Sequence, residues 1–167
     1  MNIKTITAVA LLLSANCAMA TDSPITGSVQ PKCSVYTETQ GVYGNPLPNK
    51  LDTLPASGGT KASIRYDVAQ ANFYLARITH PDSFSSSPTL DDAVAWVGSS
   101  VVGQVSVAAM SDYEAAKVIS PVNVTTFNLT LAGSTWFTVS STATYGYNKA
   151  LPAGNYTAII KADCIAK

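Results

Sequence analysis

Short segments in which polar and apolar residues alternate recur along most of the chain, and they constrain its fold more than any other feature. A two-residue period places successive side chains on opposite faces of an extended strand. Stretches rich in Gly, Pro, Asn and Ser separate these segments and are typical of turns and loops. The pattern predicts strands within 25–35, 62–68, 73–79, 93–97, 101–108, 122–131, 136–145 and 155–166, with loops or turns at 41–59 and 80–89.

Helical periodicity is almost absent from the rest of the chain. Residues 112–117 are expected to form at most one helical turn, and a change of phase near Thr125 predicts a β-bulge. There is no internal repeat and no domain linker. The sequence therefore predicts one all-β domain, an antiparallel sandwich or barrel.

The first twenty residues have the features of a secretory signal peptide. Lys4 supplies a positive charge, residues 6–13 form an apolar core, and residues 18–20 (Ala-Met-Ala) match the small-residue cleavage pattern. The apolar run is too short to span a bilayer as a stable helix. We therefore expect a signal peptide over 1–20, cleavage after Ala20 and export of residues 21–167.

Removal of the signal peptide also removes Cys17 and leaves Cys33 and Cys164 as an isolated pair. In an oxidising compartment such a pair predicts a disulfide. The bond would close nearly the whole mature chain, for which the loop-entropy model gives about 4–5 kcal/mol. Zinc is the weaker alternative, because two cysteines and a distant His80 lack ligand spacing. The disulfide would place the first and last strands side by side, or facing each other across the core.

Charge and motifs argue against several classes of function. Ten basic and ten acidic residues balance, and no basic stripe is present, so nucleic acid is not an expected partner. The motifs of serine hydrolases, phosphate-binding loops, zinc proteases and paired-cysteine redox sites are missing. We expect no enzyme activity, no catalytic residue, no cofactor and no metal.

Four conspicuous side chains have structural interpretations. His80 lies in a loop rich in Pro and Ser and is expected to be a solvated surface group. Asp91 and Asp92 are adjacent, so their side chains are not expected to converge, and a turn or cap explains them better than a metal site. Trp96 lies in an apolar stretch and is expected to be buried in the core rather than to stack on sugars.

The two ends of the chain carry its most informative motifs. A short alternating segment, residues 23–31, directly follows the expected signal peptide, and Cys33 lies in the first predicted strand. The last predicted strand begins with Leu-Pro-Ala-Gly-Asn-Tyr at 151–156. In these features the chain resembles the subunits of chaperone–usher fimbriae, whose last strand has a similar Pro-x-Gly-x-Tyr entry. At the level of residues, the resemblance covers only these ends.

The resemblance implies an incomplete immunoglobulin-like antiparallel β-sandwich that is completed by donor-strand exchange. The unpaired edges of such a sheet are first covered by a periplasmic chaperone, and then, at an outer-membrane usher, by the N-terminal extension of the next subunit. The result is a head-to-tail homopolymer, a fimbria outside the cell that supports adhesion. The implied partners are neighbouring subunits, chaperone, usher and a host-surface receptor.

Mapped onto this chain, the resemblance implies a donor segment over 21–31 and a pilin domain over 32–167. Ile25 and Val29 would fill pockets of the acceptor, and Gly27 would lie where no side chain fits. One face of the last strand would flank the acceptor groove through Tyr156, Ala158, Ile160 and Ala162. The chain departs from the family's pattern in two ways. The extension before Cys33 is short, and Cys164 lies unusually far from Cys33 in sequence.

Two other classes of function remain open from the sequence. The first is a self-complete secreted β-sandwich, an adhesin or coat-type protein that does not polymerise. The second is a periplasmic enzyme or enzyme inhibitor, which the absence of a nucleophile–base constellation disfavours. The single-domain length favours a shaft subunit over a two-domain tip adhesin.

Overall fold

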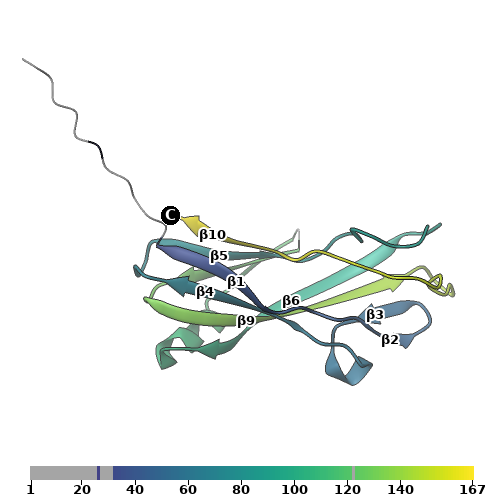
Figure 1. The fold of residues 1–167 in the computed structure, drawn as a ribbon, viewed down its shortest axis with the longest axis horizontal. Helices are drawn as coiled ribbons and strands as arrows, with labels where there is room; N and C mark the ends of the chain where they lie inside the picture. Colours follow the sequence, from purple (N-terminus) through teal and green to yellow (C-terminus); the bar gives the residue numbers. More distant parts are fainter. Residues whose placement is uncertain (1–25, 27–31, 122) are drawn as a thin grey trace, which may run out of the picture. The chain divides into compact units, whose positions relative to one another are not determined.

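The computed structural model describes residue 26 and residues 32–121 and 123–167, and in this part the predicted all-β class is confirmed. Two antiparallel sheets form the fold (Figure 1). The strands are β1 (Cys33–Thr39), β2 (Gly44–Leu47), β3 (Lys50–Asp52), β4 (Ala62–Val68), β5 (Tyr74–Thr79), β6 (Val94–Val105), β7 (Val118–Ser120), β8 (Val124–Leu129), β9 (Gly133–Tyr145) and β10 (Lys161–Ala166). Two 3₁₀ helices, η1 (Pro55–Ser57) and η2 (Ala108–Glu114), complete the elements.

The long strand β9 organises the first sheet. One of its edges pairs with β6 along nearly its full length. Its other edge pairs with β4 through its first half and with β3 through its second half. β1 lies beyond β4 and β2 beyond β3. The second sheet has the order β10-β5-β8-β7, so β1 and β10 are edge strands of different sheets.

The core lies between the two sheets, where alternate residues of β4 and β9 are buried. Tyr66 and Phe137 pack edge to face with ring centroids 5.4 Å apart, and Phe127 lies 4.2 Å from Phe137. All three side chains are fully buried. Burying a large apolar side chain contributes roughly 1.5–3 kcal/mol, so these rings anchor the contact between the sheets.

Several of the sequence-based predictions of elements are wrong. The two strands predicted at 93–97 and 101–108 are one strand, β6, with a register shift between Val102 and Gln104. The predicted loop at 41–59 contains β2, β3 and η1. No register shift occurs at Thr125, so the phase change in the sequence is not a bulge. The helical turn expected at 112–117 is the end of η2, which begins at Ala108.

The prediction for His80 is also wrong, because its side chain is buried rather than solvated. Only 4% of the residue is exposed. Its Nε2 atom lies 3.2 Å from Ser100 Oγ on β6 and 3.3 Å from Thr125 Oγ1 on β8. Gly98 on β6 leaves room for the imidazole, because a Cβ there would lie 2.2 Å from His80 Cγ. The imidazole therefore joins the two sheets.

Mild acid is expected to destabilise the fold through His80. Burial lowers the pKa of His80, while the unfolded chain takes up a proton near pH 6.5. The contribution of the neutral His80 side chain to the free energy of unfolding is therefore fully present above about pH 6.5. It decreases as the pH falls from there towards the folded-state pKa. For this one group the slope is at most about 1.4 kcal/mol per pH unit. Urea unfolding between pH 7.5 and pH 5 measures it, and H80Q serves as the comparison. An equally steep slope in H80Q would assign the effect to other groups.

Candidate functional site

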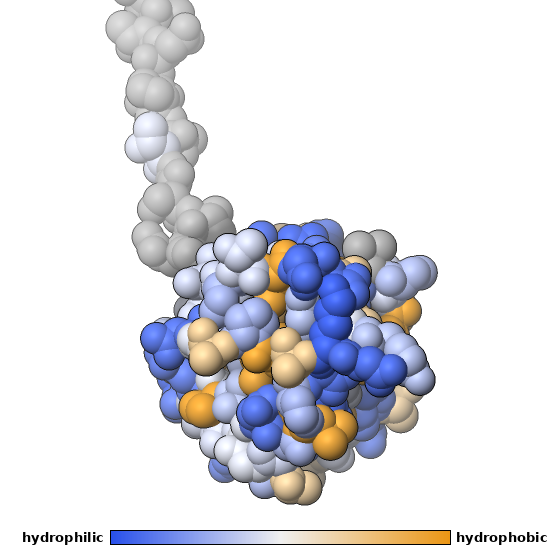
Figure 2. Space-filling view, turned by 90° about the vertical axis from the view of Figure 1, so that its right-hand side faces the viewer, coloured by the Kyte–Doolittle hydropathy of each residue, from blue (hydrophilic) through white to orange (hydrophobic). Residues whose placement is uncertain are grey.

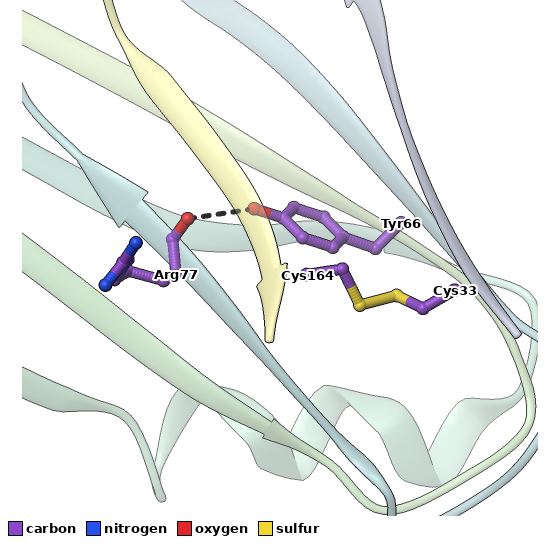
Figure 3. The surroundings of a disulfide bond; sticks show 4 residues. All are labelled: Cys33, Tyr66, Arg77 and Cys164. Carbon is purple, nitrogen blue, oxygen red and sulfur yellow. Dashed lines mark hydrogen bonds between the residues drawn. A yellow bond between two sulfur atoms is a disulfide. The ribbon is translucent and has the colours of Figure 1, made fainter. Parts of the chain in front are cut away.

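The most distinctive feature of the fold is that two unpaired sheet edges face each other. Among the described residues, β1 pairs only with β4, and β10 pairs only with β5. The disulfide predicted from the sequence is present and joins these two edges, with the Cα atoms of Cys33 and Cys164 6.3 Å apart. It therefore links the first and last strands across the sandwich rather than within one sheet (Figure 3).

Tyr66 lies beside the disulfide (Figure 3). Its hydroxyl donates a hydrogen bond to the Arg77 carbonyl oxygen, at 3.1 Å, and so connects β4 to β5. Burial raises the pKa of Tyr66 well above its usual value, so this hydroxyl keeps its proton at neutral pH. The sheets are thus held together firmly where Cys33 and Cys164 meet.

Away from the disulfide, the inner faces of both edges lose their cover. Thr37 pairs with Ile64 and shares the inner face of β1 with Cys33 and Val35, yet it is exposed. On the opposite wall, the predicted residues Tyr156, Ala158, Ile160 and Ala162 are half-buried, and 157, 159 and 161 between them are exposed. By contrast, the inward-facing residues of the central strand β4 are buried. The last segment therefore faces the core without a neighbour on one side.

Two adjoining cavities occupy the space between these edges. One, of about 350 Å³, lies between the end of β1 and residues 157–160, above Ala62 and Ile64. The other, of about 360 Å³, lies between residues 41–43, Leu51 and residues 154–158. Gly41, Thr157 and Ala158 line both cavities. Together the cavities form one continuous groove, which is bounded by residues 37–43 and 154–160. We call it the acceptor groove.

The C-terminal wall of the acceptor groove is not part of a regular strand, contrary to the strand predicted over 155–166, since β10 begins only at Lys161. Thr157 forms backbone hydrogen bonds with the loop after β5, donating to the Ser86 carbonyl and accepting from the Ser85 amide, each at 2.8 Å. In an extended chain, neighbouring residues direct their backbone groups to opposite sides. Those of Tyr156 and Ala158 therefore point to the groove, where no described residue pairs with them.

The groove contains three of the four predicted acceptor residues. Tyr156 and Ala158 line the larger cavity, and Ala158 and Ile160 line the other. Ala162 lies outside both, opposite Ile78 in the ladder of β10 and β5, and packs against the core. The predicted donor residues Ile25, Gly27 and Val29 lie outside the described residues.

Sequence reasoning missed the opposite wall of the groove. Thr39, Gly41, Tyr43 and Leu51 line it, and three of these lie in the range 41–59 that was interpreted as turns. The Tyr43 hydroxyl lies 3.0 Å from Ser141 Oγ, and burial raises the Tyr43 pKa. The alternating pattern in the sequence predicts β1 itself. It does not predict that the residues after Thr39 continue along one wall of a groove.

The two adjacent aspartates converge after all, contrary to the sequence-based expectation. Lys149 Nζ lies 3.1 Å from Asp91 and 3.4 Å from Asp92. A hydrogen bond from Tyr145 and the charge of Lys149 hold the pKa of Asp91 below its usual value. The described part of the chain contains no group of three or more residues suited to holding a metal ion. This cluster is a local ion pair at the end of the sandwich.

The surface at the end of the sandwich farthest from the disulfide carries separate hydrophobic patches among hydrophilic residues (Figure 2). Exposed apolar side chains also line the acceptor groove: Val42 is 56% exposed and Ile159 57%. Trp96, which was expected in the core, is only half-buried. Its ring packs in edge geometry against Phe84, with ring centroids 4.7 Å apart. Apolar area near the groove is thus left open to solvent.

Comparisons with protein-family models, curated proteins and solved structures find no match to this chain. Among the described residues, no helix has the length and apolar character needed to cross a membrane.

Proposed function

We propose that this chain is a structural subunit of a bacterial surface fimbria that is assembled by donor-strand complementation. One observation carries the proposal: two sheet edges that are unpaired among the described residues, joined at one end by Cys33–Cys164, flank a groove. Backbone groups on its C-terminal wall have no partner among the same residues. A β-sandwich normally pairs, covers or charges such edges. A groove between two of them is the geometry that an added strand completes.

An added strand would have backbone partners on both sides. β1 presents the edge that does not pair with β4, and Tyr156 and Ala158 present theirs from the opposite wall. The strand would bridge the two sheets and cover the half-buried inner face of the last segment. We therefore interpret the arrangement as an immunoglobulin-like sandwich that lacks one strand. Backbone hydrogen bonds would supply affinity, and the cavities would select side chains.

We expect the proposed donor segment to fit the groove through two alternate side chains. Ile25 and Val29 lie on one face of an extended chain, about 13 Å apart, with Gly27 between them. The groove has two cavities that meet at Gly41 and Ala158. We place one large side chain in each cavity and Gly27 at their junction.

Each subunit would then act as donor through residues 21–31 and as acceptor through residues 32–167. A head-to-tail contact of this kind does not close, so it builds an open fibre. The proposal includes cleavage of a signal peptide over 1–20 and passage through the periplasm with a chaperone. An outer-membrane usher would then assemble the fibre outside the cell, where adhesion to a host surface is its expected role. It assigns no enzymatic activity.

Filling the junction of the two cavities is expected to prevent strand addition. Ala158 lines both cavities, so A158F would force an incoming strand to displace a ring. Overpacking of about 1–3 kcal/mol corresponds to a loss of roughly 5- to 150-fold in affinity. Binding of a labelled peptide of residues 21–31 to the purified subunit, followed by fluorescence anisotropy, measures the effect.

A153F is the matched control, since Ala153 is exposed in the same segment and lines neither cavity. A peptide with G27L should lose affinity for the unchanged subunit for the same reason as A158F. Equal binding by all variants would contradict the assignment of the groove. A stable monomer with residues 21–31 folded into its own groove would instead support the self-complete, non-polymerising sandwich.

A further inference from the structure

Among the described residues, one loop makes the backbone hydrogen bonds of the C-terminal wall of the acceptor groove. Residues 154–160 precede β10 and take no part in its ladder with β5. Within the described part of the chain, their β-bridge is Thr157 with Ser86, in the loop that joins β5 to β6. Four hydrogen bonds form this junction: both backbone groups of Thr157 are engaged, and the Ser85 hydroxyl also donates to the Thr157 carbonyl, at 3.1 Å.

An aromatic stack supports the same junction. Phe84 packs at 5.0 Å from the Tyr156 ring and at 4.7 Å from the Trp96 ring, both with edge-type geometry. Trp96 belongs to β6 in the first sheet, whereas Tyr156 lines the groove. Phe84 therefore connects the groove wall to a strand of the rigid sandwich.

Pro88 contacts the start of the wall from the same loop. A Cβ at position 154 would lie 2.5 Å from Pro88 Cγ, and the Gly154 φ of +155° disfavours other residues as well. The loop thus touches the wall at Gly154, Tyr156 and Thr157. These contacts do not use the backbone groups of Tyr156 and Ala158, which have no partner among the described residues.

We propose that the clamp loop, residues 84–88, is a positioning element that holds the groove wall extended before a donor strand arrives. This inference rests on the proposed function. A wall already held in the bound conformation loses less conformational freedom on binding, which increases affinity and the fraction of productive encounters. Once the donor strand is in place, its own hydrogen bonds hold the wall. The clamp loop should therefore affect capture of the strand more than its release.

The test uses the chain of residues 32–167, whose groove no neighbouring donor segment can occupy, with F84A, F84Y and F73A. Phe73 is a matched control because it is 53% exposed and lines neither cavity of the groove. Two quantities are measured: amide hydrogen exchange in 154–160 and in β4, and the rates of capture and release of a labelled peptide of residues 21–31. Loss of both aromatic contacts should slow capture by F84A about tenfold.

F84A should also speed amide exchange of Thr157 about tenfold while exchange in β4 stays unchanged. F84Y should restore both quantities, and F73A should change neither. General destabilisation would instead raise exchange in β4 together with the wall, and that outcome overturns the inference. Unchanged exchange and capture in F84A overturn it too. If the unaltered chain captures no peptide, the proposed function fails, while the exchange comparison still decides whether the loop holds the wall.

Discussion

A mature chain that lacks residues 21–31 is expected to form no fibres, whereas the chain of residues 21–167 polymerises. Polymerisation needs one donor segment and one acceptor groove per subunit, because each head-to-tail contact uses one of each. Deletion removes the donor and leaves the groove walls at 37–43 and 154–160 intact. The effect is therefore all or none, unlike the graded losses expected of groove variants. Electron microscopy and sedimentation velocity measure it.

Two controls separate donor loss from misfolding. A peptide of residues 21–31 added to the truncated chain should bind and raise its stability, since a ligand bound only to the folded state stabilises it. A peptide in which Ile25 and Val29 are both replaced by Asp should do neither, because the charges would lose their hydration on entering the cavities without a paired cation. Fibres of normal length from the truncated chain would refute the donor assignment. A truncated chain that binds a chaperone but not the peptide would place the groove elsewhere.

Removal of the disulfide is expected to cause the largest loss of stability from a single bond. Cys33 and Cys164 are separated by 131 positions. Closing a loop of this length contributes about 5 kcal/mol in the chain-entropy model. For a domain of this size, that loss corresponds to a fall in melting temperature of roughly 10–20 °C. The loss should exceed the chain-entropy value if the two unpaired edges also separate.

Urea unfolding of the C33S/C164S variant, compared with the unaltered chain with and without reductant, measures this loss. Reductant should destabilise the unaltered chain to the level of the variant and leave the variant unchanged. S34A, next to the disulfide on β1, is the matched control and should change stability little. A difference below about 1 kcal/mol would mean that contacts such as Tyr66 hold the sheets together without the bond.

Alternation of residue types was enough to predict most strands, because one face of a strand in a sandwich packs against the core and the other is nearer to water. β4 and β9 alternate between buried and half-buried positions, and the sequence shows the same period. The prediction fails where a tertiary contact, and not exposure to water, decides which residue is present. The predicted gap between the strands 93–97 and 101–108 contains Gly98, which makes room for the His80 side chain within the continuous strand β6.

The candidate site was partly predictable for the same reason. Tyr156, Ala158 and Ile160 share one face in the sequence and one groove wall in the structure. The opposite wall was not predictable, because Gly41 and Leu51 lie in a segment that carries turn residues and only short strands. The clamp loop was read correctly as a loop, but its contact with Thr157 joins positions 71 and 72 residues apart, which no local pattern reports.

By itself the sequence determined the all-β class, the pairing of Cys33 with Cys164 and the face presented by the last segment, since strand periodicity and the chemistry of an isolated cysteine pair are local or compositional properties. Only the tertiary structure decided that β1 and β10 are edges of different sheets, that a groove opens between them and that His80 is buried. Those features depend on which strands become neighbours. That choice is made by the packing of the whole core rather than by any one segment.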